Sequence, residues 1–247
     1  MSSDSLPGIF SLPLFPLHSV LFPHFTLQLH IFEERYRVMI SECIEKNTPF
    51  GVVLIREGTE VGAPPTPYEV GCIARILAVK RLEDDRMLLI AGGDERFRVL
   101  EYFEADLPYL VGRVEMLCDT PDSLPEDEVL TEEVKFLLDR YLHVLADRVG
   151  IPLPNVDLPP EIEQLGLFIA SIAQMPATDK QRLLEMTDSV VRLETEKIFL
   201  REQIEVLESI PDDLPGDEEQ TAGSIQIALP LDTQDERWRQ YRGESRN

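Results

Sequence analysis

The fold is decided by a proline-rich apolar stretch near the start of the chain, residues 11–40, which reads SLPLFPLHSVLFPHFTLQLHIFEERYRVMI. Its apolar residues are dense enough for a protein core, yet three prolines interrupt it, namely Pro13, Pro16 and Pro23. Proline has no backbone N–H and fixes φ, so it is kept out of helix interiors and out of the central strands of a sheet. The stretch therefore predicts an edge strand over residues 12–17, a second short extended piece that ends at Phe22-Pro23, and a strand completed by residues 28–31. The prolines are expected to shape the rim of a small barrel.

Further strands are predicted along the first half of the chain. Short runs of alternating or continuous apolar residues, separated by polar turns, are typical of an antiparallel sheet. These runs cover residues 50–55, 70–82, 87–93, 96–103 and 109–117. One helix interrupts them over residues 33–46, where apolar side chains recur at three-to-four spacing. We therefore expect an α+β protein whose first part is an antiparallel, barrel-like sheet with one inserted helix.

Helical periodicity replaces strand alternation after a polar linker that begins at Asp119. Apolar residues recur every three to four positions along residues 130–145 and again along residues 162–172, as on the buried faces of packed helices. The tetrapeptide TDKQ at residues 178–181 matches a capping box, with its threonine as N-cap and its glutamine at N3. Residues 119–210 are therefore expected to form a helical bundle.

The last predicted helix carries apolar residues with alternating spacings of four and three, as in a heptad seam. These positions are Met186, Val190, Leu193, Leu200, Ile204 and Leu207, with Lys197 in the middle of the series. Two interpretations stay open: a helix packed on the two before it, or the seam of a homodimer in which Lys197 fixes the register. Asp188 is a second open point, because it could split the helix in two.

The chain ends in an acidic segment, residues 211–247, which has few large apolar residues and is predicted to be disordered. Two islands interrupt it: SIQIAL at residues 224–229 alternates like a strand, and RWRQYR at residues 237–242 contains the only tryptophan. The sequence thus divides into a sheet over residues 9–118, a bundle over residues 119–210 and an acidic tail.

The charge balance restricts the partners. The chain has 247 residues, 43% of them hydrophobic and 28% charged, and a formal net charge of −23. Such a charge repels phosphate backbones and anionic membrane surfaces, so neither nucleic acid nor membrane is expected as a partner. Cys43, Cys72 and Cys118 lie far apart, and the first ten residues lack the basic region of a secretory signal. Both features favour a reducing, cytoplasmic location.

No motif for catalysis or for a cofactor is recognisable. The sequence contains no phosphate-binding G-x-x-x-x-G-K-[ST], no H-E-x-x-H and no G-x-S-x-G. His18, His24 and His30 recur at intervals of six, which does not place them on one helix face, so no metal site is expected. Three charged residues are predicted to tie the inserted helix to the barrel through an ion network, namely Glu33, Arg35 and Arg96.

Aromatic residues are the remaining candidates for a functional surface. Phe15, Phe22, Phe25, Phe32, Tyr36 and Tyr109 exceed what the core of a thin barrel clearly needs. Either all of them are core, or at least two are exposed in an apolar patch of the kind that marks a binding site. The candidate binding residues at such a patch are Phe22, Pro23, Phe25, Phe32, Tyr36 and Tyr109.

Several segments together resemble one family, the N-terminal substrate-binding domain of the Lon protease in its standalone bacterial form. They are LPLFPLHSVLFPHFTLQLHIFEERYRVMI, FGVVLI, VGCIARI, RMLLIAGGDERFRV and DKQRLLEMTDSVVRLE. The resemblance, which extends to part of cereblon, implies a PUA-like pseudo-barrel followed by a helical bundle. It also implies binding of unfolded or degron-bearing polypeptides. The ATPase and Ser-Lys peptidase modules of Lon do not fit in 247 residues, so a peptidase label would describe ancestry.

The expected function is therefore a non-catalytic polypeptide-binding module without a cofactor. Its expected partners are unfolded or degron-bearing polypeptides, a separate protease, and a second copy bound through the C-terminal helix. The alternative is a hydrolase accessory subunit or an enzyme with an unrecognised site. Nucleic-acid binding by analogy with PUA folds rests on the fold alone, and the acidic charge opposes it.

Overall fold

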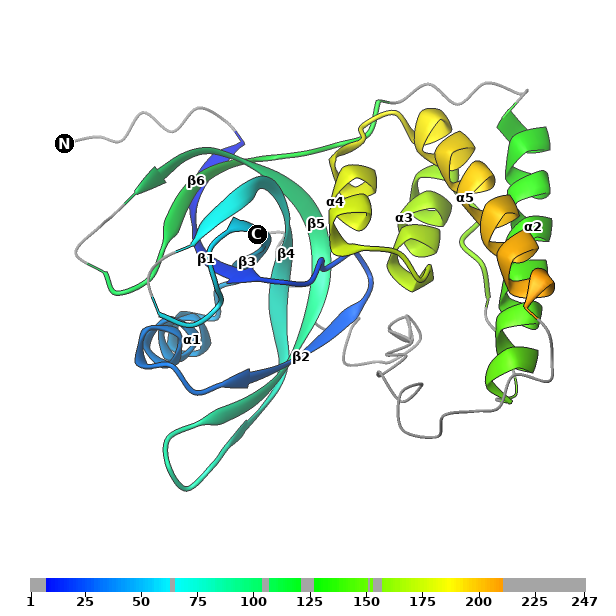
Figure 1. Cartoon of the computed structure of the whole chain (residues 1–247). Coiled ribbons are helices and arrows are strands. Elements are labelled where there is room, and N and C mark those ends of the chain that lie inside the picture. The colour runs from blue at the N-terminus through cyan, green and yellow to red at the C-terminus, as the bar shows by residue number, and fades with distance from the viewer. Residues whose placement is uncertain are drawn as a thin grey trace. The chain divides into compact units, whose positions relative to one another are not determined.

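The computed structural model describes residues 8–62, 65–103, 107–120, 127–150, 152 and 157–210. In these residues the protein is α+β, with a six-stranded mixed sheet and five helices (Figure 1). They form two compact units. The sheet unit holds the residues up to Cys118 together with Gln174–Glu185, and the helical unit holds Asp119–Ala173 and the residues from Met186 on. The predicted tail, residues 211–247, lies outside the described residues.

The sheet is ordered β2-β5-β4-β3-β1-β6, and β5 also pairs with β6. The strands are β1 Ile9–Leu17, β2 Thr26–Ile31, β3 Phe50–Glu57, β4 Thr66–Arg81, β5 Met87–Phe103 and β6 Val111–Met116. Strands β5, β4, β3, β1 and β6 thus form a closed cycle of pairings, with β2 attached to β5 outside it. In Figure 1, β4 and β5 run side by side as one long hairpin.

The expectation of an entirely antiparallel sheet is wrong at one pair. Strands β1 and β3 run parallel, while the pairs β1–β6, β2–β5, β3–β4, β4–β5 and β5–β6 are antiparallel. The chain between β1 and β3 passes through β2 and the helix α1, which is long enough for the crossover that a parallel pair needs.

The prolines of β1 do not mark an edge strand, because β1 has a neighbour on each side. Residues 9–13 pair with β6, and residues 14–17 pair with β3. Pro13 is the last residue paired with β6, and the amide of Leu14 donates to the Leu110 carbonyl at 2.8 Å. Amides two residues apart in a strand point the same way, so Pro16 lacks its N–H on the side where pairing with β6 has already ended. The prolines therefore sit where β1 changes partner.

Helix α1, Glu34–Lys46, connects β2 to β3 and buries the face that its spacing predicts. Tyr36, Met39, Ile40 and Cys43 are buried in a core cluster that includes residues of β1 to β5. Asn47 ends the helix in the left-handed region, with φ 50°, and its amide donates to the Ile44 carbonyl. Asparagine tolerates this conformation better than most residues, which explains the sharp stop before β3.

Helix α4, Ala177–Glu185, belongs to the sheet unit, whereas the sequence suggested a single helical part over residues 119–210. The predicted capping box is also wrong, because the helix begins before Thr178. The Pro176 carbonyl already accepts the amides of Asp179 and Lys180. Gln181 instead is buried, and its Nε2 donates to the Val70 carbonyl of β4 at 3.0 Å and to Glu185. This glutamine fastens α4 to the sheet.

The helical unit contains α2 Asp127–Val149, α3 Ile162–Ile172 and α5 Ser189–Ser209, and α5 contacts both of the others. Leu193, Leu200 and Ile204 of the heptad series are buried. Asp188 does split the last predicted helix: it is the N-cap of α5, and its Oδ1 accepts the Val191 amide at 2.9 Å. Among the described residues, Lys197 pairs with Glu194 and with Glu133 of α2.

Candidate functional site

The structure places most of the predicted binding aromatics in the core. Phe15, Phe22, Phe25, Tyr36 and Tyr109 are buried, as is Pro23. Phe32 alone among the six aromatic candidates is exposed, at 48% of its surface. Neither of the two alternatives holds as stated, because one of these six aromatic side chains is exposed and the other five are buried. Phe32 is the candidate that a ligand can reach directly.

Phe22 and Phe25 are buried because the turn between them is held against β5. The Gly93 amide donates to the Phe25 carbonyl at 2.7 Å, and the His24 amide donates to the Gly93 carbonyl at 2.9 Å. A Cβ on Gly93 would lie 2.1 Å from the Phe22 carbonyl oxygen, so the backbones approach more closely than any other residue allows. His24 completes the turn with φ 66°. A glycine inside a strand often marks such a close approach of another backbone.

Tyr36 is held by neighbours on both sides. Its ring stacks on Phe15 with centroids 4.1 Å apart, and the Arg35 guanidinium lies 4.6 Å from the ring centroid. Burial raises the pKa of the Tyr36 phenol to about 12, with a smaller opposing effect of the Arg35 charge. Tyr36 therefore stays neutral at physiological pH and serves the core.

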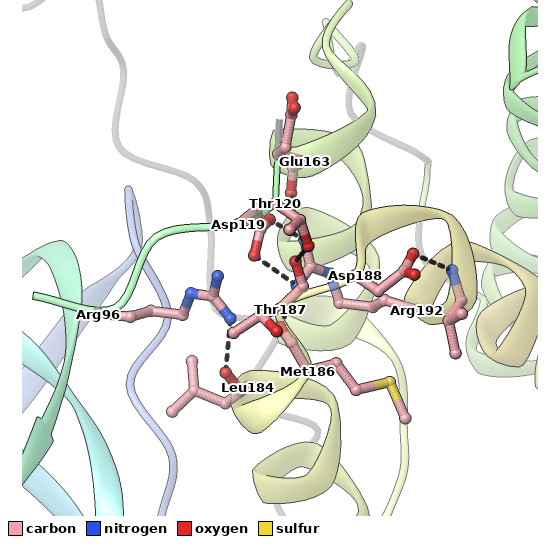
Figure 2. Close-up of polar contacts among 10 residues, drawn as sticks. Arg96, Asp119, Thr120, Glu163, Leu184, Met186, Thr187, Asp188 and Arg192 are labelled. Carbon is pink, nitrogen blue, oxygen red and sulfur yellow. Dashed lines mark hydrogen bonds and ion pairs between the residues drawn. The ribbon is translucent and has the colours of Figure 1, made fainter. Parts of the chain in front are cut away.

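The three predicted ion-network residues contact two different helices of the sheet unit, α1 and α4. Arg35 lies 3.1 Å from Glu33 and donates to the Glu60 carbonyl at 2.8 Å, which fixes the start of α1. Buried Arg96 on β5 donates from Nη1 to the Leu184 carbonyl of α4 at 2.7 Å (Figure 2). The prediction that Arg96 serves the inserted helix is corrected by this bond, since only the fold reveals that α4 packs on β4 and β5.

An exposed apolar face covers β2 and the adjoining half of β5. Leu88 and Ile90 are 44% and 39% exposed, and they alternate with the buried residues Met87, Leu89 and Ala91. Across the strand pair, His30 lies opposite Leu88 and Gln28 lies opposite Ile90. The Phe32 ring follows at 5.8 Å from the His30 ring. We call these residues, Gln28, His30, Phe32, Leu88 and Ile90, the edge face.

The edge face borders an open strand edge. In the part of the chain that the structure describes, β2 pairs with β5 alone. Its sequence TLQLHI contains no proline, no acidic residue and no lysine or arginine, and its register has no bulge. Prolines, charged side chains and bulges are the features with which proteins usually block pairing at a strand edge, and β2 has none of them. The alternation MLLI at residues 87–90 could have revealed Leu88 and Ile90, which the sequence-based list of candidates missed.

The described residues offer no obvious site for a metal ion, since no group of three or more His, Cys, Asp or Glu side chains comes together among them. Burial raises the pKa of the Cys72 and Cys43 thiols, so neither is a ready nucleophile, whereas Cys118 is exposed. Within the described ranges, no helix is both long and apolar enough to span a lipid bilayer.

The fold defines the class of protein, because it matches solved Lon N-terminal domains. The Lon N-terminal domain protein from Xanthomonas campestris is 29% identical and has a TM-score of 0.55, covering 82% of this chain and 99% of that one. The N-terminal domain of Mycobacterium avium complex Lon protease has a TM-score of 0.58 at 17% identity, covering 78% of this chain and 98% of that chain. The second likeness concerns the fold alone.

Sequence comparison gives the family. The model described as "ATP-dependent protease La (LON) substrate-binding domain" matches residues 11–202, so the chain belongs to the LON substrate-binding domain family. The Lon protease of Syntrophus aciditrophicus (strain SB) is 29% identical over 214 residues, which are 82% of this chain and 26% of that protein. The Lon protease of Parabacteroides distasonis is 30% identical over 182 residues, 72% of this chain and 22% of that protein.

The chain thus spans about a quarter of the length of these curated relatives. What is matched is the substrate-binding domain, and not a catalytic domain.

Proposed function

We propose that this protein is a non-catalytic module that binds unfolded or otherwise exposed apolar segments of polypeptides. The edge face carries the proposal, because it combines three exposed apolar side chains with an open strand edge. The family supports it, since the matched model is described as a substrate-binding domain of a protease. Substrates of a protease are polypeptides.

The proposed mode of binding is strand addition at β2. An open edge offers main-chain N–H and C=O groups to any extended segment, so affinity does not depend on one sequence. Phe32, Leu88 and Ile90 would then select for apolar side chains next to the added strand. Of the residues first assigned to binding, Phe32 would be the direct anchor, while Phe22, Pro23, Phe25, Tyr36 and Tyr109 are buried and belong to the framework of the sheet unit.

Several finer features belong to the same proposal. The closed cycle of strands is a PUA-like pseudo-barrel, and α2, α3 and α5 are a bundle. The clients include degron-bearing polypeptides that a separate protease receives, and the protein works in the cytoplasm. A homodimer through the C-terminal helix would use Val191 and Ile198, which are exposed one heptad apart on α5.

Titration of the full chain against unfolded casein tests the proposal. Binding should be weak, with a Kd in the micromolar range (about −8 kcal/mol), because a short added strand buries little area. A stably folded protein of similar size should not bind, and neither ATP nor casein should be hydrolysed. Absence of binding at about 100 μM chain (about 100 times a 1 μM Kd) would contradict the proposal. Hydrolysis that stays with the chain through successive purification steps would favour an enzyme instead.

A further inference from the structure

The open edge of β2 presents the main-chain groups of every second residue. The Phe25 carbonyl accepts the Gly93 amide at 2.7 Å, so Phe25 directs its C=O toward β5. Main-chain groups two residues apart in a strand point the same way, and the register of β2 with β5 has no bulge. Thr26, Gln28 and His30 therefore direct their amides and carbonyls away from β5, toward the open edge.

These three residues make the edge of β2 complementary to a second copy of itself. When two β2 strands are paired antiparallel and centred on Gln28, this residue lies opposite Gln28 of the second copy. Thr26 of each copy then lies opposite His30 of the other. Every outward-pointing residue thus meets an outward-pointing residue, and each such pair exchanges two main-chain hydrogen bonds. The register gives up to about six hydrogen bonds and leaves no outward group of β2 unpaired.

The same register also matches the side chains, because residues directly opposite each other in a sheet lie on one face. On the exposed face, the Gln28 amides of the two copies meet, and each amide can both donate and accept. On the core face, Leu27 lies opposite Leu29 of the second copy. Leu27 is only partly buried at the margin of the core cluster that contains Leu29. Pairing would therefore cover the part of Leu27 that a single chain leaves in water.

The charge distribution permits two acidic chains to approach each other at this edge. The chain has a formal net charge of −23, so two copies repel each other. Residues 26–32 and 87–93, however, contain no aspartate, glutamate, lysine or arginine. The exposed residue of β4 that lies opposite Leu88 is basic, Lys80. The paired edges therefore bring no acidic side chains directly together, and salt screens exposed charges that lie further apart than about 8 Å.

We propose that two copies of this protein pair antiparallel through β2, with a two-fold axis at Gln28, so that their sheets become continuous. A strand of six residues buries little area, so association is weak, with half of the chains paired at about 10–100 μM. The pairing covers the edge at which clients would add a strand, and therefore competes with clients. This regulatory consequence, unlike the pairing itself, rests on the function proposed above.

Complementary charges at residue 28 test the two-fold axis. Because Gln28 meets its own copy, a charge placed there always faces the same charge, which weakens a strand pair. Gln28→Lys alone and Gln28→Glu alone should each associate about 5- to 10-fold more weakly than the parent chain. An equimolar mixture of the two variants should form mixed dimers at least as readily as the parent. The measurement is analytical ultracentrifugation of the full chain over about 1–500 μM, a range that brackets the expected association.

The matched controls are Ile198→Lys and Ile198→Glu, which make the same charge changes on α5, where a helix-mediated dimer would form. Ile198 is 56% exposed, and both variants should associate like the parent, alone and mixed. Thermal unfolding of each Gln28 variant should match the parent, because Gln28 is exposed. A parent chain that stays monomeric throughout would overturn the proposal. Gln28 variants that associate like the parent, or whose mixture associates no better than either variant alone, would overturn it as well.

Casein separates this proposal from the proposed function. The association assay contains no client, so its failure leaves the binding of clients untouched. Unfolded casein added to parent dimers should dissociate them, because both use the edge of β2. Dimers that persist while casein binds would overturn the regulatory consequence and place the client elsewhere than on β2. Dimers that form in the absence of any casein binding would uphold the pairing and contradict the proposed function.

Discussion

Replacing Phe32 by alanine should weaken client binding and leave the fold intact. The side chain is 48% exposed, so a client can remove only about half of it from water. Complete burial of a phenylalanine side chain is worth about 1.5–3 kcal/mol, and half of that is roughly 0.7–1.5 kcal/mol. Since about 1.4 kcal/mol corresponds to a tenfold change, the Kd should rise roughly 3- to 12-fold.

The assay is fluorescence anisotropy of a labelled casein fragment titrated with the full chain, with thermal unfolding of each variant measured in parallel. Phe136→Ala is the matched control, because Phe136 is an exposed aromatic at 67% but lies on α2 in the other unit. Leu88→Ala should weaken binding to a similar degree as Phe32→Ala. Phe22→Ala, in contrast, should cost about 3–5 kcal/mol of stability because the side chain is buried.

The reasoning is refuted if Phe32→Ala and Leu88→Ala bind as tightly as the parent chain while Phe136→Ala binds more weakly. That result would place the client on the helical unit. A loss of folding in Phe32→Ala would show instead that the side chain is part of the core.

Three further predictions concern the framework of the two units. Leu200→Ala should lower the free energy of unfolding by about 2–5 kcal/mol in urea titrations, because the side chain is fully buried. A loss below about 0.5 kcal/mol would mean that α5 is not packed at this position. Gly93→Ala should destabilise the sheet unit and release the turn at Phe22, because the new Cβ would lie 2.1 Å from the Phe22 carbonyl oxygen. The measurement is hydrogen exchange of the His24 amide, which should become faster. Unchanged exchange would contradict this prediction. Glu196 has a folded-state pKa above its unfolded one, so its contribution to stability is present below the unfolded pKa of about 4.3 and is lost as pH rises through the folded value. Glu196→Gln should therefore match the parent near pH 4 and be more stable at pH 8, and equal stability at both pH values would rule the effect out.

Local pattern was enough to predict most elements of the sheet unit. Alternating or continuous apolar runs predicted the strands that became β3, β4 and β6, and helical spacing predicted α1 and its buried face. The two strands predicted over residues 87–93 and 96–103 are instead one continuous strand, β5. These properties follow from the two repeat periods of the backbone, which any segment shows independently of its partners. The N-cap at Asp188 is of the same kind, since its bond to the Val191 amide joins residues three apart.

The candidate site was predicted only in part. Phe32 was on the list of aromatic anchors and is exposed, but its neighbours Leu88 and Ile90 were not on it. Aromatic content alone cannot tell a core side chain from an exposed one. Phe22 and Phe25 are buried because the turn between them is hydrogen-bonded to Gly93. This glycine lies 68 residues beyond Phe25 in the sequence.

The sequence by itself determined the periodicities of the strands and helices, the acidic charge, and the motifs that place the chain in the LON substrate-binding domain family. The tertiary structure decided which elements became partners. It gave β1 two neighbours in spite of its prolines, assigned α4 to the sheet unit, and brought Arg96 to Leu184 and Arg192 to Asp119. The physical reason is range: periodicity and capping depend on residues within one or two turns of each other, whereas strand order and buried ion pairs depend on segments that only the folded chain brings together.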